Sequence, residues 1–216
     1  MHRAEEDYIK SIYELTVEKQ RELIKVSELS LFLELADQTV NETVKKLESK
    51  GLLNFMPYKG VTLTKKGHRE AIRLIRTHRI WEVFLTEKLG YNWGDVHEEA
   101  ERLEHATSER LLNRLDEYLG SPQQCGHGNP IPLPSGKSEP VSTTSMFSLE
   151  AGDLFKIVRV QDNQNLLAYL DKQGIGINQH YVVKSKDIFG EIMEISGEKV
   201  HHLSKQVACM IFVDIK

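Results

Sequence analysis

The chain has 216 residues, 40% hydrophobic and 28% charged, which is the composition of a globular protein with one to three small domains. No apolar run is long enough to span a membrane, the polar first residues carry no secretory signal, and two cysteines in such a chain favour free thiols, so we expect a cytoplasmic protein without a membrane partner. The formal net charge of -4 argues weakly against nucleic acid, yet residues 41–69 carry seven lysines and arginines against two acidic residues.

The first predicted elements are those of a winged helix-turn-helix. Apolar residues at helical spacing predict a helix over residues 5–15. Ser27 is a candidate N-cap for a short second helix, and a third runs from Thr39 to Ser49. Two strands, residues 52–55 and 61–64, then form a hairpin or wing. Because this is the basic segment, DNA is the favoured partner, although small helical domains with a hairpin also exist without DNA.

The next two helices carry imidazoles and carboxylates one turn apart. A long helix over residues 66–89 places His78 and Glu82 at i and i+4. A second, acidic helix, for which Asp95 is a candidate N-cap, has four such residues on one face: His97, Glu101, Glu104 and His105. Matched faces of this kind build internal metal sites in helical bundles. The alternative is a solvated acidic face, and the missing H-E-x-x-H spacing argues against a zinc protease.

The rest of the chain changes from helical to strand periodicity. After a helix over about residues 108–119, Cys125 and His127 lie two residues apart in a loop, where both can reach one metal, although two ligands alone make no site. A Pro- and Ser-rich linker follows. Several short strands then predict a small barrel, with a last strand over residues 207–213 that includes Cys209 in the core.

Taken together, these motifs resemble those of the metal-dependent repressors of the diphtheria toxin repressor class, and most closely those of the manganese-responsive branch. The resemblance covers nearly the whole chain and depends on the order and spacing of its motifs. These are Glu6-Asp7-Tyr8-Ile9, Thr39 to Val44, Pro57 to Val61, His78-Arg79 with Glu82, His97 to Glu101 with Glu104-His105, and Cys125-Gly-His127-Gly followed by Pro130-Ile131-Pro132.

The resemblance implies a mainly α protein with a small β domain. It assigns a winged helix-turn-helix DNA-binding domain to residues 1–72 and a helical dimerisation and metal-binding domain to residues 73–140. A linker at residues 141–147 leads to an SH3-like β-barrel domain at residues 148–216. The implied protein is a homodimer and no enzyme.

The resemblance also implies two metal sites. The primary site takes Asp7, Glu101, Glu104 and His105, with His78 close by. A second site takes Glu82, Cys125, His127 and Asp162. Manganese-responsive relatives with two domains carry a glutamate ligand where this chain has Lys10, which argues against a bridged two-metal cluster. Hard carboxylate donors favour Mn²⁺, with Fe²⁺ as the alternative, whereas Zn²⁺ or Cd²⁺ suits the thiol site.

The implied mechanism is that metal ties Asp7 in the DNA-binding domain to the dimerisation domain, so that the spacing of two recognition helices matches operator DNA. The candidates for reading base edges are Gln38, Thr39, Asn41 and Glu42. The candidates for backbone contacts are Thr43, Lys45, Lys46 and Lys59.

The expected function is therefore that of a manganese-dependent repressor of metal-uptake genes. The alternatives are an iron-responsive regulator of the same family and a winged-helix regulator whose metals are structural. Less favoured are a sensor of an organic ligand, a carboxylate-rich metallohydrolase, and a regulator in which the C-terminal domain is the sensor.

Overall fold

The computed structural model describes residues 2–18, 21–138 and 140–216. The chain divides into two compact units, Met1–Thr77 with Pro132–Lys137 and His78–Ile131 with Ser138–Lys216. The division falls within one long helix, α4 (Lys65–Leu89). Across the described ranges, every helix is too short or too polar to cross a membrane. The domain boundaries expected after residues 72, 140 and 147 stay predictions.

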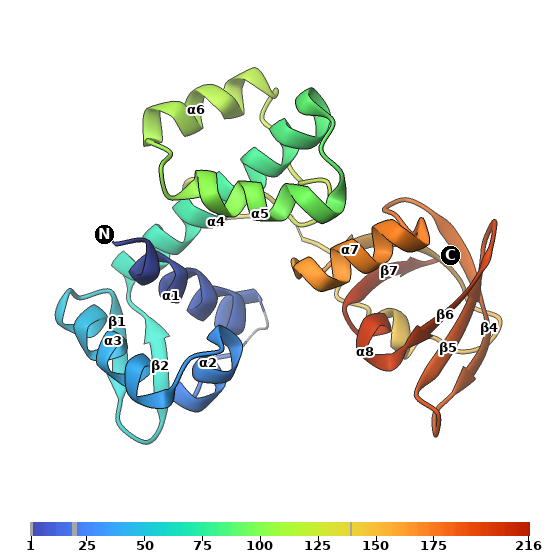
Figure 1. The fold of residues 1–216 in the computed structure, drawn as a ribbon, viewed down its shortest axis with the longest axis horizontal. Coiled ribbons are helices and arrows are strands. Elements are labelled where there is room, and N and C mark those ends of the chain that lie inside the picture. Colours follow the sequence, from blue (N-terminus) through green and yellow to red (C-terminus); the bar gives the residue numbers. More distant parts are fainter. Residues whose placement is uncertain (1, 19–20, 139) are drawn as a thin grey trace. The chain divides into compact units, whose positions relative to one another are not determined.

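The first unit is a winged helix-turn-helix, as predicted (Figure 1). Its strands β1 (Leu53–Met56) and β2 (Gly60–Leu63) pair antiparallel, and the turn between them forms the wing. Its helices are α1 (Arg3–Tyr13), which a short π-helix (Glu14–Glu18) continues, α2 (Val26–Leu33) and α3 (Asp37–Ser49).

One apolar core holds these elements together. Ile9 of α1 packs in it with Val40 and Val44 of α3, all three without exposed surface. The wing joins this core at Gly60, where a Cβ would lie 2.2 Å from the carbonyl oxygen of Ile24. Only glycine fits there, so the wing extends from a fixed base.

Two predicted helix caps are wrong. Helix α2 begins after Lys25 rather than at Ser27, because the Glu28 carboxylate accepts a hydrogen bond from the Lys25 backbone N–H at 2.9 Å. Asn92 rather than Asp95 caps α5 (Trp93–Glu104), and its side-chain oxygen accepts from the Asp95 N–H at 3.0 Å. In α2 the N–H that is satisfied belongs to the N-cap residue, and in α5 it belongs to the first turn. Both helices therefore begin earlier in the chain than the pattern indicates.

The second unit begins with the C-terminal half of α4, followed by α5 and α6 (Glu109–Tyr118). Ser108 caps α6 by accepting from the Leu111 N–H at 3.2 Å. Ile80 of α4 packs with Leu112 of α6 in a small core that also includes Cys125. This core places the loop after α6 next to α4.

A five-stranded antiparallel sheet completes the second unit, in the order β6-β5-β4-β3-β7 (Figure 1). Helix α7 (Gln164–Gln173) follows β3 and packs against α5, and Trp93 of α5 packs against the core of the sheet. The strands are β3 (Leu154–Val160), β4 (His180–Asp187), β5 (Ile192–Ser196), β6 (Val200–Ser204) and β7 (Ile211–Ile215). The sheet is thereby attached to the helices that carry the predicted ligands.

The strand predicted over residues 207–213 is wrong in its first half. Ser204 accepts a hydrogen bond from the Val207 N–H at 3.3 Å and caps the short helix α8 (Lys205–Ala208), so that strand β7 begins only at residue 211. Cys209 ends this helix and is exposed rather than buried, and both cysteines are free. A short apolar run does not distinguish a helical turn from a strand by its periodicity.

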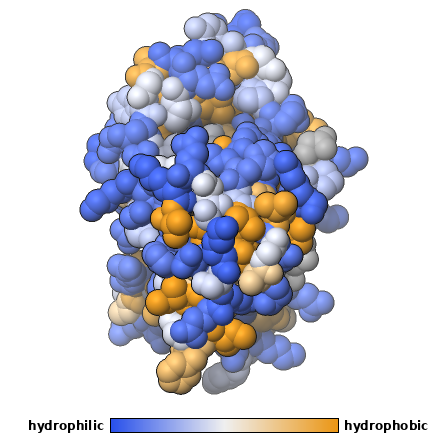
Figure 2. Space-filling view, turned by 90° about the vertical axis from the view of Figure 1, so that its right-hand side faces the viewer, coloured by the Kyte–Doolittle hydropathy of each residue, from blue (hydrophilic) through white to orange (hydrophobic). Residues whose placement is uncertain are grey.

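The surface in Figure 2 is mostly hydrophilic, with apolar residues in separate patches between polar ones. In the second unit the solvent-exposed apolar residues include Ile188 and Phe189 in the turn between β4 and β5. Scattered apolar exposure of this kind is ordinary for a folded protein.

Candidate metal centres

One candidate centre combines four side chains from separate parts of the second unit. Glu82 lies on α4, Cys125 and His127 lie in the loop after α6, and Asp162 follows β3. Each offers a donor atom within 4.8 Å of the donor atoms of the other three. We call this group the thiol centre. Spacing in the sequence indicates only the pair in the loop, and the two carboxylates enter through the family resemblance.

The loop of the thiol centre is held in place by its backbone. The Cys125 N–H donates to the carbonyl oxygen of Asn129 at 2.9 Å, which closes the loop. The Val160 N–H of β3 donates to the carbonyl oxygen of His127 at 3.0 Å, and Nδ2 of Asn129 donates to that of Val160 at 2.9 Å. The two loop side chains are therefore positioned by the sheet domain.

The polar atoms of the thiol centre converge without satisfying one another. His127 is 1% exposed, and its Nδ1 lies 3.1 Å from Oε1 of Glu82 and 3.4 Å from Oδ1 of Asp162. Among the described residues, neither ring nitrogen of His127 nor Oε2 of Glu82 has a partner in hydrogen-bond geometry. Leaving buried polar atoms in this state is costly, and a cation between them removes the cost. The donor set therefore fits a divalent metal.

The pKa values in the thiol centre show that it favours positive charge. Burial and the charge of Glu82 raise the pKa of Cys125 to about 12, which keeps the thiol neutral. Burial opposes a charged His127, but Glu82 and Asp162 outweigh it and raise the pKa of this imidazole. Burial and Glu82 oppose ionisation of Asp162, but His127 and Arg79 outweigh them and lower its pKa to about 2. Without a metal, a protonated imidazole supplies the positive charge.

Asp162 is held in place by Asn129, which the sequence analysis missed, and by Arg79, to which it gave no role. Nδ2 of Asn129 donates to Oδ1 of Asp162 at 2.7 Å. A guanidinium nitrogen of Arg79 approaches Oδ2 at 3.5 Å, and another donates to the carbonyl oxygen of Pro130 at 2.7 Å. Arg79 follows His78 on a buried part of α4. No local spacing in the sequence indicates this contact, although a buried arginine requires an anionic partner.

A second group shares Glu82 with the thiol centre. Nε2 of His78 lies 3.1 Å from Oε1 of Glu82 and 3.2 Å from Nδ1 of His97. Each of the three residues offers a donor atom within 4.8 Å of the others, and the two imidazoles meet edge to face. Burial opposes ionisation of Glu82, but His127 and His78 outweigh it and lower its pKa. The structure thus brings His97 together with α4 rather than with the end of its own helix.

The remaining predicted ligands of α5 lie at its C-terminal end. Glu101 and Glu104 are in the last turn, His105 follows as the C-cap, and a donor atom of each lies within 4.8 Å of the others. We call these three residues the acidic centre. Glu104 has no exposed surface, and its Oε2 lies 2.6 Å from Nδ1 of His78. Asp7, the fourth expected ligand, lies on α1 in the first unit, and its place in this centre stays a prediction.

The predicted DNA-contacting residues lie on α3 and on the wing. Lys46 is partly engaged within the protein, because its Nζ lies 2.9 Å from Oε1 of Glu5, which Lys50 approaches at 2.7 Å. Tyr58 at the wing tip was not predicted, and it is fully exposed with a φ of 64°. Gln38, Thr39, Glu42, Lys45, Lys46 and Lys59 are exposed, and Asn41 and Thr43 are half-buried.

Three known protein families match successive parts of the chain. The iron dependent repressor N-terminal DNA binding domain matches residues 1–61, the iron dependent repressor metal binding and dimerisation domain matches residues 64–133, and the FeoA domain matches residues 145–215. The iron-dependent repressor IdeR of Mycobacterium leprae is 30% identical over 97% of this chain and 96% of that protein.

Two solved structures are similar over nearly their whole length. The structure of the manganese regulator SloR has a TM-score of 0.83 and 33% sequence identity, and the similarity covers 98% of each chain. The structure of ScaR with bound Zn²⁺ has a TM-score of 0.85 and 31% identity, over 97% of this chain and 98% of that one.

Proposed function

The chain belongs to the iron-dependent repressor family and is a metal-dependent transcriptional repressor, and from this premise we propose that its signal is Mn²⁺ and that its targets are metal-uptake genes. The observation that carries the choice of metal is the acidic centre. Two carboxylates and an imidazole are hard donors that suit Mn²⁺ or Fe²⁺. The similarity to a manganese regulator favours Mn²⁺, and the similarity to an iron-dependent repressor keeps Fe²⁺ as the alternative.

We assign a separate metal position to the thiol centre. Its sulfur donor favours Zn²⁺ or Cd²⁺ over Mn²⁺ in raw affinity. The similar protein ScaR has been solved with Zn²⁺ bound, which supports a site of this chemistry. The direct support from this chain is the buried imidazole of His127, whose nitrogens make no hydrogen bond of good geometry among the described residues although two carboxylates lie close to it.

The proposed mechanism joins the two units of the chain. Asp7 lies on α1, which packs with recognition helix α3 in the core of the winged helix. We assign Asp7 to the same ion as Glu101, Glu104 and His105, so that binding orients the DNA-binding unit relative to the dimerisation region. A dimeric helix-turn-helix protein needs its recognition helices about 34 Å apart, and metal binding thus shifts the population toward a DNA-competent state.

The proposed DNA interface consists of α3 and the wing. Base edges are read by Gln38, Thr39, Asn41 and Glu42, and phosphates are bound by Thr43, Lys45, Lys46 and Lys59. We add Tyr58 at the wing tip. A fully exposed aromatic side chain on a backbone at positive φ is strained, and such strain is often kept where a side chain must meet a partner.

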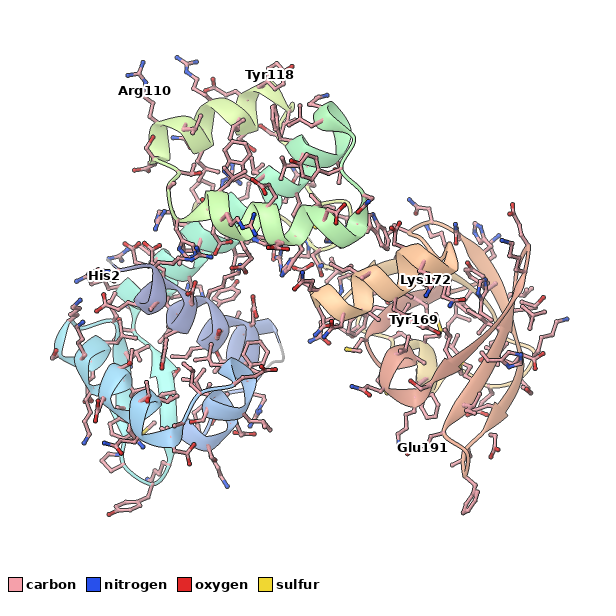
Figure 3. All side chains as sticks on the ribbon, in the orientation of Figure 1. His2, Arg110, Tyr118, Tyr169, Lys172 and Glu191 are labelled. Atoms are coloured by element: carbon pink, nitrogen blue, oxygen red, sulfur yellow. The ribbon has the colours of Figure 1, made fainter. Side chains whose placement is uncertain are left out.

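The proposed dimer interface is formed by α4 and α6. Leu111 and Tyr118 of α6 are 43% and 68% exposed, and Tyr118 packs against Phe84 of α4 with ring centroids 6.3 Å apart. Figure 3 shows Tyr118 on the outer surface of α6. The matched family domain is described as one of metal binding and dimerisation, and we place the dimer in the cytoplasm.

The test is operator binding at fixed salt during titration with Mn²⁺, Fe²⁺ or Zn²⁺, because phosphate contacts alone change affinity by orders of magnitude with salt. Fluorescence anisotropy of DNA from the protein's own promoter region reports binding. Glu104→Ala should reduce the stimulation by Mn²⁺ at least as much as the 10- to 100-fold that changes to ligand-supporting residues cause. Glu98→Ala is the matched control, since Glu98 is exposed on the same helix and pairs with Arg102.

The outcomes separate the candidates. Stimulation by Mn²⁺ that Glu104→Ala removes and Glu98→Ala keeps supports the proposal. Stronger stimulation by Fe²⁺ identifies an iron-responsive regulator. Equal binding in the presence of a chelator would leave a DNA-binding protein whose metals are structural.

A further inference from the structure

We propose that the sheet domain carries a binding site for a small zwitterion, a free α-amino acid. The site is a cavity of about 350 Å³ between the C-terminal end of α7, the start of β4 and the turn that joins β5 to β6. A volume of this size is at the lower end of those that bind small molecules. The residues that line the cavity within the described ranges include none of the predicted metal ligands, so the inference is independent of the metal centres.

The walls of the cavity are held in place by Gln179 and Gly197. Oε1 of Gln179 accepts from the Gly176 N–H at 2.9 Å and from the Tyr181 hydroxyl at 2.5 Å. Nε2 of Gln179 donates to the carbonyl oxygen of Gly174 at 3.3 Å, which ties the end of α7 to β4. A Cβ at Gly197 would lie 2.9 Å from the Tyr181 ring, so the β5–β6 turn packs directly on this ring. The cavity is therefore formed before a ligand enters, and such pre-organisation favours binding.

The buried side chain of His201 indicates that the cavity receives a ligand. His201 is 7% exposed and lines the cavity, and its ring meets that of Tyr181 edge to face at a centroid separation of 5.9 Å. Among the described residues, no side chain or backbone group makes a hydrogen bond to the His201 ring. A buried polar group in this state is costly, and a hydrogen-bonding atom of a ligand in the cavity removes the cost.

One anion and one cation lie side by side at the edge of the cavity. Glu198 and Lys199 are both exposed in the β5–β6 turn, and neither forms an ion pair with another side chain of the described ranges. Their charges act on the cavity. Burial, together with the charge of Lys199, lowers the pKa of His201. Burial, together with the charge of Glu198, raises the pKa of Tyr181. The cation therefore acts on the His201 side of the cavity and the anion on the Tyr181 side.

This arrangement selects a class of ligand by charge. A simple anion would face Glu198 and a simple cation would face Lys199, so each would meet repulsion at one end of the site. The histidines and the carboxylate of the cavity form no group of three clustered ligand atoms among the described residues, which argues against a metal ion. A zwitterion satisfies both charges. Its carboxylate binds Lys199 and His201, and its ammonium group binds Glu198 beside the ring of Tyr181.

The experiment is a titration of the full, isotope-labelled chain followed by nuclear magnetic resonance. The probe is L-alanine, and two matched analogues each lack one charge: propionate lacks the ammonium group, and ethylamine lacks the carboxylate. The backbone N–H resonances of residues 197–201 report binding in the cavity. We expect a Kd of about 1 mM for L-alanine, which a ligand with so few atoms can reach. Each analogue should bind about 10-fold more weakly, because each loses one charge-assisted interaction.

Two variants in the turn test the charges, at exposed positions where the fold tolerates a neutral side chain. Glu198→Gln should make L-alanine bind no better than propionate, and Lys199→Gln should make it bind no better than ethylamine. Lys184→Gln is the matched control, because it removes an exposed cation of β4 outside the cavity and should leave all three affinities unchanged.

A third variant tests the buried imidazole. His201→Phe keeps a ring against Tyr181 but removes the two nitrogens, and it should weaken L-alanine binding about 10-fold. Thermal unfolding verifies that each variant is folded, and the two turn variants decide the question if His201→Phe does not fold.

Three outcomes would overturn the proposal. The absence of a saturable shift at residues 197–201 would remove the site. Equal affinity of the wild type for L-alanine and propionate would make it an anion site. An unchanged preference for L-alanine in both turn variants would place its binding elsewhere. These measurements use no metal and no DNA, so their failure is distinguishable from failure of the proposed function.

Discussion

Replacement of Gly128 by alanine tests how the sheet domain builds the thiol centre. Gly128 has a φ of 75°, and a Cβ there would lie 2.0 Å from the carbonyl oxygen of Val158 and 2.9 Å from the Cα of Arg159. Ordinary contacts of a Cβ begin near 3.4 Å, so the loop must move away from β3. Both atoms belong to the backbone and cannot rotate out of the way.

The magnitude follows from what that movement breaks. The positive φ costs alanine about 1 kcal/mol. Displacement of the loop also disrupts the two hydrogen bonds that join it to β3, at His127 and Asn129, each contributing about 1 kcal/mol. We expect Gly128→Ala to lower the free energy of unfolding by about 3 kcal/mol and to weaken Cd²⁺ binding at the thiol centre.

Gly120→Ala is a matched control for this prediction. Gly120 has a φ of 76°, but a Cβ there would meet nothing within 4 Å. It therefore carries the same backbone cost without the clash, and we expect a loss of about 1 kcal/mol with unchanged Cd²⁺ binding. Urea denaturation followed by circular dichroism gives the stability, and cadmium–thiolate absorbance gives the binding. Equal stability and equal Cd²⁺ affinity in the two variants would refute the argument.

Two further predictions concern the thiol and the first unit. Cys125→Ser should abolish the cadmium–thiolate absorbance while Mn²⁺ binding at the acidic centre persists, and loss of all metal binding would contradict the division into two centres. Lys50 and Lys46 lower the pKa of Glu5 from 4.5 to about 2, so their contribution to stability is complete above about pH 4.5 and is lost as the pH falls toward about 2. The stability of Glu5→Gln, measured by thermal unfolding, should therefore change less with pH in this window than that of the wild type. We expect the difference in the free energy of unfolding to be only about 1 kcal/mol, because both lysines are exposed. An unchanged pH dependence would show that the ion pairs do not stabilise the fold.

Much of the fold was predictable because local patterns determine it. The stripe that buries Ile9, the basic helix that ends before Gly51 and the hairpin around Tyr58 are all local signals, and each element formed where the pattern indicates. The errors are also local. At residues 207–213 a single apolar run contains a helical turn and the start of a strand, which no periodicity separates.

The candidate centres were less accessible to sequence reasoning. His97 shares a helix face with Glu101, Glu104 and His105, which suggests one site. His97 and Glu104 are seven residues apart, however, and seven residues of helix extend about 10 Å, which is more than one ion can bridge. The ligand-type residues of this helix face therefore belong to two separate groups, one with His97 and one with Glu101, Glu104 and His105. Asn129 and Arg79 contact Asp162 only once the loop packs against the sheet domain. These residues are far apart in the sequence, so no local spacing predicts the contact.

The ligands of the thiol centre are synthesised over a long stretch of the chain. They are synthesised in the order Glu82, Cys125, His127 and Asp162. Strand β3, which positions the loop, is synthesised after all three residues of the acidic centre. Contacts between residues far apart in the sequence also require the closure of long loops, which slows their formation. A nascent chain therefore presents its hard donors before its sulfur-containing pocket exists. The thiol centre is completed only by a chain that has already been synthesised through its sheet domain.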